Sequence, residues 1–128
     1  MAYTLLRMRI FRFWPLLVVL CLIDTHSAIS WQTVQIKDVT KSETIVLRKW
    51  RHQGAIYAMQ VNISGRIKGR ARVQLILHSD PYKEEQLSGK VHVMWRGDWY
   101  SDEAEIRYQP EDVDSGGLKI RYRFIDPR

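Results

Sequence analysis

Apolar and polar residues alternate along most of the chain after residue 28. Such a period of two places the apolar side chains on one face of a β-strand. It is clearest in the segments 55–63, 71–78 and 118–124, and no stretch of ten or more residues after residue 28 shows a helical period. The pattern predicts seven strands, at about 31–37, 43–50, 55–63, 71–78, 87–96, 99–108 and 118–125.

Clusters of Gly, Pro, Asp and Ser separate these segments, as expected for turns between short strands. Seven short strands predict an all-β fold, an antiparallel β-sandwich of immunoglobulin-like size. The cysteine pair of a true immunoglobulin domain is absent, because Cys21 is the single cysteine of the chain. A small β-barrel is the alternative architecture.

Two hairpins follow from the parity of the apolar positions. The strands 55–63 and 71–78 both carry apolar residues at odd numbers, so a five-residue loop at 65–69 would place Ile63 opposite Ala71. In the sequence Trp-Arg-Gly-Asp-Trp, Gly97-Asp98 is a favoured two-residue hairpin turn. That turn would pair Arg96 with Trp99, as a cation–π contact, and Trp95 with Tyr100.

The tripeptide Arg96-Gly97-Asp98 is also the adhesion signal Arg-Gly-Asp. That signal requires both charged groups to be splayed at the tip of an exposed loop. The hairpin register instead uses Arg96 as the last residue of a strand. The pattern therefore favours a structural turn over an integrin-type ligand.

The first 28 residues resemble a secretory signal peptide. Three arginines precede an 11-residue apolar run at 13–23, and small residues follow at Ser27 and Ala28. This run is shorter than the roughly 20 residues that a membrane-spanning helix needs, although a retained anchor is the alternative. We therefore expect a signal peptide at 1–28, a single domain at 29–128, and no stable membrane span after cleavage.

Cleavage would remove Cys21 and leave a mature domain without cysteine. Small exported domains usually depend on disulfides in oxidising compartments, so this one must rely on its hydrophobic core. The combination fits a periplasmic, cell-surface or secreted location in a bacterium. Residues 29–128 contain 17 basic and 13 acidic residues, and this net charge of +4 is too small to predict nucleic-acid binding.

The densest basic cluster lies at 65–72, in the predicted loop. Its cations are a candidate contact for an anionic partner, such as lipid headgroups, surface polysaccharide or an acidic protein patch, and the alternative is a solvated hairpin tip. Together with two residues of the second hairpin, the candidate binding residues are Arg66, Lys68, Arg70, Arg72, Arg96 and Trp99. A second basic stripe, Lys119, Arg121 and Arg123, is expected to pair with Glu103 and Glu105 across neighbouring strands.

The sequence contains no recognisable catalytic or metal-binding motif. His52, His78 and His92 lie in separate segments without metal-ligand spacing, and no serine lies in a nucleophile elbow. The segment 110–117 begins like a calcium loop, but its closing acidic position would fall on Arg123. We expect no cofactor, no metal and no enzymatic activity.

Two functions are compatible with these features. The first is an exported, non-catalytic binding or assembly module that contacts a protein or an anionic envelope polymer through a sheet edge or the basic loop. The second is a small carbohydrate-binding or glycan-acting protein that uses exposed tryptophans, with Trp50 and Trp99 as the platform. Asn62 begins an N-glycosylation acceptor pattern, which matters only in a host that glycosylates.

Overall fold

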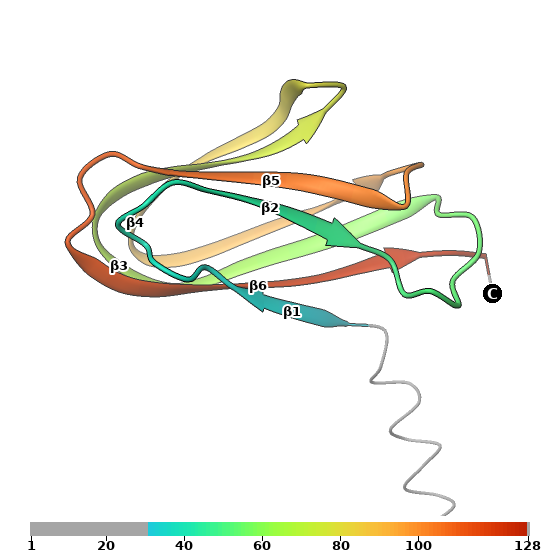
Figure 1. Ribbon diagram of the computed structural model, residues 1–128, viewed down its shortest axis with the longest axis horizontal. Helices are drawn as coiled ribbons and strands as arrows, with labels where there is room; N and C mark the ends of the chain where they lie inside the picture. The colour runs from blue at the N-terminus through green and yellow to red at the C-terminus, as the bar shows by residue number, and fades with distance from the viewer. Residues whose placement is uncertain (1–30, 128) are drawn as a thin grey trace, which may run out of the picture. The chain divides into compact units, whose positions relative to one another are not determined.

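The computed structural model describes residues 31–127, which form an all-β antiparallel fold (Figure 1). Within that range there are six strands and no helix. The strands are β1 (Gln32–Gln35), β2 (Glu43–Arg48), β3 (Ala58–Leu77), β4 (Asp80–Asp98), β5 (Glu103–Pro110) and β6 (Ser115–Ile125). The predicted signal peptide at 1–28 and Cys21 lie outside the described residues.

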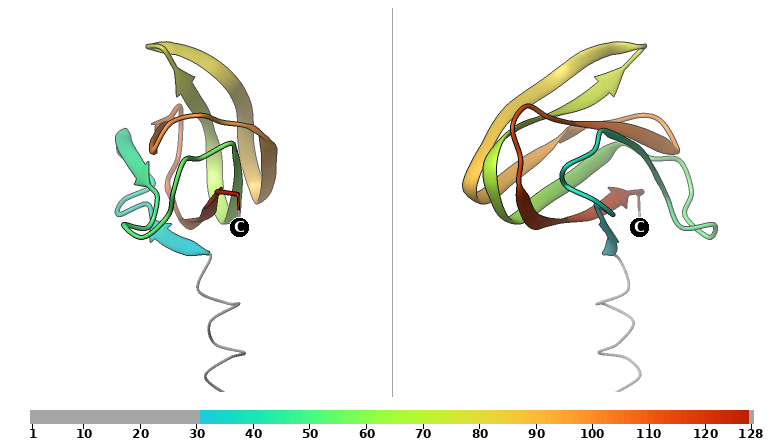
Figure 2. Two further views of the ribbon diagram at one scale, coloured as in Figure 1. Left: turned by 90° about the vertical axis from the view of Figure 1, so that its right-hand side faces the viewer. Right: turned by 60° about the vertical axis from the view of Figure 1, so that its left-hand side comes forward.

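The fold is built around β3 and β4, two long strands that pair along their whole length and bend together. Figure 2 shows this curled hairpin from two sides. On its other edge, β3 pairs with β6 over 58–68 and with β5 over 71–76. The bend therefore divides one continuous sheet into the two layers of a β-sandwich.

We name the two layers by their strands. Sheet 1 contains β1, β6, the first half of β3 and the second half of β4; sheet 2 contains β2, β5, the second half of β3 and the first half of β4. The predicted sandwich is thus confirmed, although it is made from six strands because two of them serve both sheets.

The core lies between the inward faces of the two sheets. It takes the odd-numbered residues of β3, and Val61, Ile63 and Val73 are at most 1% exposed. Ile106 and Tyr108 of β5 and Ile120 of β6 face them from the neighbouring strands. Burying one such aliphatic side chain contributes about 1.5–3 kcal/mol, so the alternation seen in the sequence supplies the main driving force for this fold.

The bend in β3 lies where the sequence predicted a hairpin loop. Gly65 and Gly69 have φ angles of 143° and 126°, and a Cβ at Gly69 would lie 1.9 Å from the carbonyl oxygen of Asp112. The glycines thus allow the chain to turn a corner against its neighbours while remaining a strand. The predicted pairing of Ile63 with Ala71 is wrong, because Ile63 pairs with Val93 and Ile120.

The turn of the β3–β4 hairpin is His78–Ser79, whose φ angles are 52° and 70°. The predicted turn at Gly97–Asp98 is wrong, because β4 runs through to Asp98 beside β3. Trp95 pairs with Val61 instead of Tyr100, and Arg96 pairs with Gln60 instead of Trp99. The Arg-Gly-Asp tripeptide therefore lies at the end of a strand.

Candidate functional site

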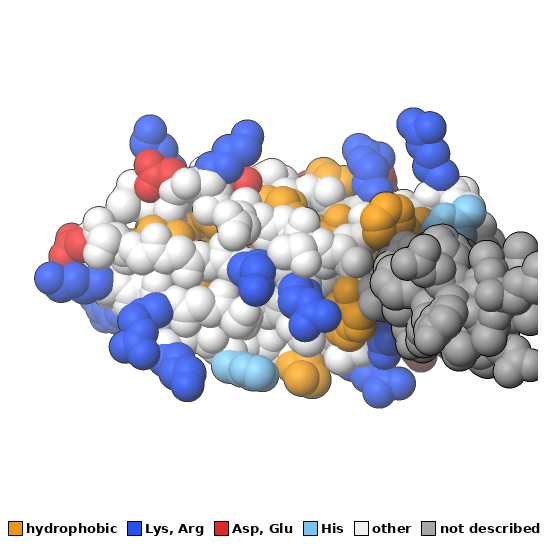
Figure 3. Space-filling view, turned by 90° about the horizontal axis from the view of Figure 1, so that it is seen from below, with side chains coloured by type: hydrophobic (Ala, Val, Ile, Leu, Met, Phe, Trp, Pro, Cys, Tyr) orange, Lys and Arg blue, Asp and Glu red, His pale blue; other side chains and the backbone are white. Residues whose placement is uncertain are grey.

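The outer face of sheet 1 carries an unusual concentration of positive charge. The segments that build it, 32–35, 58–66, 90–98 and 117–123, contain a single acidic residue, Asp98, at the end of β4. They contain six cations, Arg66, Lys90, Arg96, Lys119, Arg121 and Arg123. Figure 3 views this side of the domain and shows blue Lys and Arg side chains across it, with red acidic side chains confined to its margins. We call this surface the basic face.

The charges of sheet 2, in contrast, are nearly balanced. Its strand segments, 43–48, 70–77, 80–88 and 103–110, contain six acidic and five basic residues. Three ion pairs neutralise its outer face: Arg48 with Glu103 at 2.7 Å, Arg107 with Glu105 at 2.9 Å, and Arg72 with Glu84 at 3.2 Å. The modest net charge of the domain therefore averages a neutral sheet with a strongly basic one.

On the basic face the cations form two rows. One follows β6 with Lys119, Arg121 and Arg123, and the other follows β4 with Lys90, His92 and Arg96. Alternate residues of a strand are about 6.8 Å apart, and two strands separated by a third are about 10 Å apart. These spacings make the basic face a pair of parallel positive rows.

The strip between the two rows belongs to β3 and is polar but uncharged. Gln60, Asn62 and Ser64 pair with the β6 row on one side and the β4 row on the other. These side chains are shorter than the flanking lysines and arginines, and none of the three is fully exposed. The basic face thus has a polar floor with basic margins.

Trp31 holds part of the β6 row in place. The guanidinium carbons of Arg121 and Arg123 lie 4.8 and 4.7 Å from the centroid of its ring. Arg123 also donates a hydrogen bond of 3.1 Å to Oε1 of Gln60. Two arginines beside one ring lose some conformational freedom, so they are partly organised before any ligand arrives.

Two polar atoms of this surface are buried without a hydrogen-bond partner in the described protein, Oδ1 of Asn62 and Nε of Arg123. An unpaired buried polar group costs about 1–3 kcal/mol. Both atoms lie at the boundary between the polar floor and the β6 row. Both atoms are shielded from solvent, so a ligand that lies on the basic face does not reach them.

Two surface depressions lie where the basic face meets the bend. One of about 560 Å³ is lined by Arg66, Lys68 and the glycines of β4 and β6, and one of about 340 Å³ is lined by Gln35, Ser64 and Lys119. Gly117 contributes to both. The hollow part of this surface is therefore continuous with its positive rows.

The structure divides the predicted cluster at 65–72. Arg66 lies on the basic face and Lys68 lies beside it at the bend. Arg70 is instead neutralised by Asp112. Oδ1 of Asp112 accepts a 2.7 Å hydrogen bond from the Arg70 backbone N–H, and Oδ2 forms an ion pair with the Arg70 guanidinium at 3.3 Å. These hydrogen bonds lower the pKa of the Asp112 carboxyl below its usual value. Arg72 lies on sheet 2, where it also donates to Gln109 at 2.7 Å.

The other hairpin supplies one of its two candidates. Arg96 lies on the basic face, in the β4 row. Trp99 is 5% exposed and its Nε1 donates to the carbonyl of Glu103 at 3.0 Å, so its ring is a core element. The predicted cation–π contact between these two residues does not form.

The predicted pairing of the C-terminal stripe with Glu103 and Glu105 is wrong. Lys119, Arg121 and Arg123 face Gln35 and Thr33 on β1 and neutral residues on β3, whereas Glu103 and Glu105 lie on β5 in the other sheet. The sequence signal that would have identified them is the scarcity of acidic residues in the four segments of sheet 1, where Asp98 is the single one.

The expected tryptophan platform is not present. Trp99 and Trp95 are buried, and Trp50 is partly buried and stacks on His52 at 6.4 Å between ring centroids. The exposed aromatic residues among 31–127 are tyrosines, Tyr57, Tyr82 and Tyr100. A tryptophan-based sugar site at Trp50 and Trp99 therefore has no geometric support.

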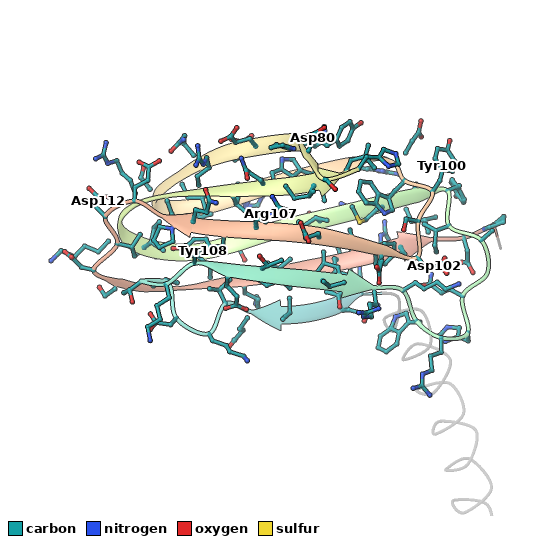
Figure 4. All side chains as sticks on the ribbon, turned by 45° about the horizontal axis from the view of Figure 1, so that its top comes forward. Asp80, Tyr100, Asp102, Arg107, Tyr108 and Asp112 are labelled. Atoms are coloured by element: carbon teal, nitrogen blue, oxygen red, sulfur yellow. The ribbon has the colours of Figure 1, made fainter. Side chains whose placement is uncertain are left out.

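Two carboxylates do converge in a shallow depression of about 300 Å³ on sheet 2. Glu103 and Glu105 line it together with His78, but each carboxylate is paired with an arginine. Arg107 points outward from β5 here, whereas the adjacent Tyr108 points into the core (Figure 4). Within residues 31–127, no three His, Cys, Asp or Glu side chains are grouped to hold a metal ion, and no helix could cross a membrane.

Comparison with known proteins identifies no relative by sequence, because no family model and no curated protein matches the chain. Several solved β structures resemble its fold. A de novo designed double-stranded β-helix covers 74% of this chain and 97% of its own, with 13% identity and a TM-score of 0.37. The crystal structure of PirA covers 75% of this chain and 94% of its own, with 8% identity and a TM-score of 0.45. A carbohydrate-binding module of the CBM4 type covers 74% and 71%, with 7% identity and a TM-score of 0.40.

Proposed function

We propose that this chain is an exported, non-catalytic binding module whose basic face takes up a linear polyanion, such as an anionic envelope polysaccharide. One observation carries the proposal: six lysines and arginines lie on one sheet face whose strand segments contain a single carboxylate, Asp98 at the end of β4. A fold alone needs no such separation of charge, because sheet 2 of the same domain balances its cations with ion pairs.

Repulsion between the cations of the basic face favours the binding of a polyanion. Two like charges 4 Å apart repel by about 1 kcal/mol in water, and salt screens charges over about 10 Å at 0.1 M. The cations of adjacent positions on β6 lie within that screening length. A polyanion laid over them removes the repulsion and releases its own condensed counterions, which favours binding at low salt.

The shape of the basic face favours a linear polymer. Two positive rows about 10 Å apart border a neutral strip, so a single extended chain can lie on the floor with its anions directed to both sides. The floor presents the polar side chains of β3, and the margins present lysine and arginine side chains. Hydroxyl groups and anionic oxygens of a polysaccharide supply donors and acceptors for such groups.

The test is a binding measurement with a matched pair of variants. Residues 29–128 are titrated with heparin, a sulfated linear polysaccharide used as the probe, and with neutral dextran. Lys119→Gln/Arg121→Gln removes two cations from the basic face, and Lys41→Gln/Arg51→Gln removes two exposed cations elsewhere. Both variants have the same net charge.

We expect the first variant to lose tenfold or more in heparin affinity at low salt. We also expect the slope of log K against log salt to fall by about two, one for each contact removed. The control should keep the wild-type slope. Equal losses in both variants, or equal binding of dextran and heparin, would show that the basic face is not the site.

Export is a separate part of the proposal. It rests on the basic and apolar pattern of residues 1–28. Expression of the full chain in a bacterium, followed by fractionation and N-terminal sequencing, should yield a mature protein that starts at residue 28 or 29. An intact cytoplasmic chain would contradict this part and leave the binding proposal untouched.

A further inference from the structure

β4 is an edge strand along its entire length. Among the described residues it pairs with β3 alone, so one side of a 19-residue strand has no partner. Trp99 N donates to Tyr57 O just beyond the Ala58–Asp98 pair, so the hydrogen-bonded pairs of the β3–β4 ladder here are odd-numbered, such as Met59 with Gly97. Such pairs recur at every second residue, so the odd-numbered residues of this half of β4 bond to β3. The even-numbered residues, including Met94, direct their backbone N–H and C=O groups to the free side.

The two halves of this edge are protected to different degrees. The half in sheet 2, 80–88, contains Pro81 and two consecutive acidic residues, Glu84 and Glu85, which discourage pairing with another strand. The half in sheet 1, 90–98, contains no proline. Near its middle, Met94 exposes 56% of its surface although it is a large apolar residue. The 90–98 half also carries charged side chains, but they include both signs, Lys90 and Arg96 against Asp98, so they can pair with one another between two copies.

We propose that a second copy of this chain pairs with the 90–98 half of β4, in antiparallel orientation about a two-fold axis at Met94. In this register Lys90 of each copy lies opposite Asp98 of the other, so two ion pairs form across the seam. His92 lies opposite Arg96, and the two Met94 side chains meet at the axis. On the inner face, Val93 of one copy meets Trp95 of the other.

Neighbouring registers are less favourable. Moving the two-fold axis from Met94 to Val93 places Lys90 opposite Arg96, which sets two cations against each other. Moving the axis to Trp95 leaves Lys90 opposite Tyr100, which lies beyond the end of β4, and places Met94 opposite Arg96. Of these three registers, only the proposed one places Asp98 opposite a lysine or arginine, because an axis at Trp95 places it opposite His92.

The dimer would join the two copies of sheet 1 edge to edge, since the free side of β4 belongs to that sheet. Their basic faces would then form one continuous surface, and a long polyanion could contact both copies at once. Two linked sites bind more tightly than either alone because the second contact is intramolecular. The dimer itself does not depend on the ligand, so it can be tested without any polyanion.

Sedimentation velocity of residues 29–128, over a wide concentration range and without polyanion, is the experiment. The wild type should form a dimer. Asp98→Lys and Lys90→Asp should each raise the dimer dissociation constant at least tenfold, and Lys90→Asp/Asp98→Lys should restore it. A wild type that stays monomeric throughout, or a double variant no better than the single ones, would overturn the proposal.

Proline variants test which edge is used. Met94→Pro removes an N–H that points to the free side of β4, so the fold should survive while the dimer is lost. Thr33→Pro is the matched control: Ile36 N donates to Leu118 O, so Thr33 directs its own N–H to the free side of β1, the opposite edge of sheet 1. A folded Met94→Pro protein that still dimerises, or a Thr33→Pro protein that does not, would show that another surface is responsible.

Discussion

Replacing Gly116 by alanine tests whether the bend at the end of sheet 1 requires the close approach of two backbones. Gly116 has a φ of 136°, and a Cβ there would lie 2.2 Å from the carbonyl oxygen of Arg66 and 2.7 Å from Cα of Ile67. Both are main-chain atoms of β3, so no side chain can move aside. Either β6 separates locally from β3, or the strand conformation changes.

The cost follows from two contributions. A non-glycine residue held in this region of φ costs about 1–3 kcal/mol. Moving β6 away from β3 forfeits at least one ladder hydrogen bond, about 1 kcal/mol. A loss of about 3 kcal/mol is large beside the 5–15 kcal/mol stability of a typical domain. At 4–8 °C for each kcal/mol, it should lower Tm by at least about 12 °C.

Two other glycines separate the steric effect from the torsional one. Gly117 has no atom within 4 Å of its added Cβ and no positive φ, so Gly117→Ala should change stability by no more than about 0.5 kcal/mol. Gly89 also has open space but a φ of 59°, so Gly89→Ala should cost about 1 kcal/mol from the left-handed backbone alone. Urea unfolding and calorimetry give all three values. A Gly116→Ala protein as stable as Gly117→Ala would refute the reasoning.

Two further predictions concern ionisable groups. Tyr108 is fully buried and donates a 2.6 Å hydrogen bond to Val39 O, and burial raises the pKa of its hydroxyl. Its contribution to folding stability should therefore be fully present below pH 10 and decline as pH rises toward the higher folded pKa. Tyr108→Phe should cost about 1–3 kcal/mol at neutral pH and weaken this alkaline decline, and unfolding at pH 7 and above pH 10 measures both. The hydrogen bonds from Arg70 lower the pKa of Asp112, so its contribution is present above the ordinary carboxyl pKa and is lost as pH falls through the lower folded value. Carbon-detected NMR titration should find Asp112 below the ordinary aspartate range, and Asp112→Asn should reduce stability at pH 5 more than at pH 2; equal reductions would contradict the assignment.

The sequence predicted the fold class but not the pairing of its strands. Alternation fixes which residues face the core, so it identified Val61, Val73 and Ile120 correctly. It does not distinguish a hairpin loop from a bend in a continuous strand, since both preserve odd-number parity. Ile67 was the available clue: it continues the odd apolar series through the predicted loop, and it is buried.

The candidate site was predicted only in part, because the sequence does not show which distant strands pair. The cations of 65–72 were recognised as a group from their proximity in sequence, and Arg96 was added from the predicted second hairpin, but the bend separates Arg66 from Arg72 onto different sheets. The C-terminal stripe was assigned to the wrong neighbours because its partner strands are distant in sequence. Only the non-local pairing of β6 with β3 brings both basic rows onto one face.

The central claim is that a polyanion binds the outer face of sheet 1. The most direct test is a titration of isotope-labelled residues 29–128 with a short heparin oligosaccharide, followed residue by residue through amide chemical shifts. We expect the shifts to concentrate in 60–66, 90–96 and 117–123, and to diminish together as salt is added. Shifts centred on β2 and β5, or spread evenly over both sheets, would contradict the account.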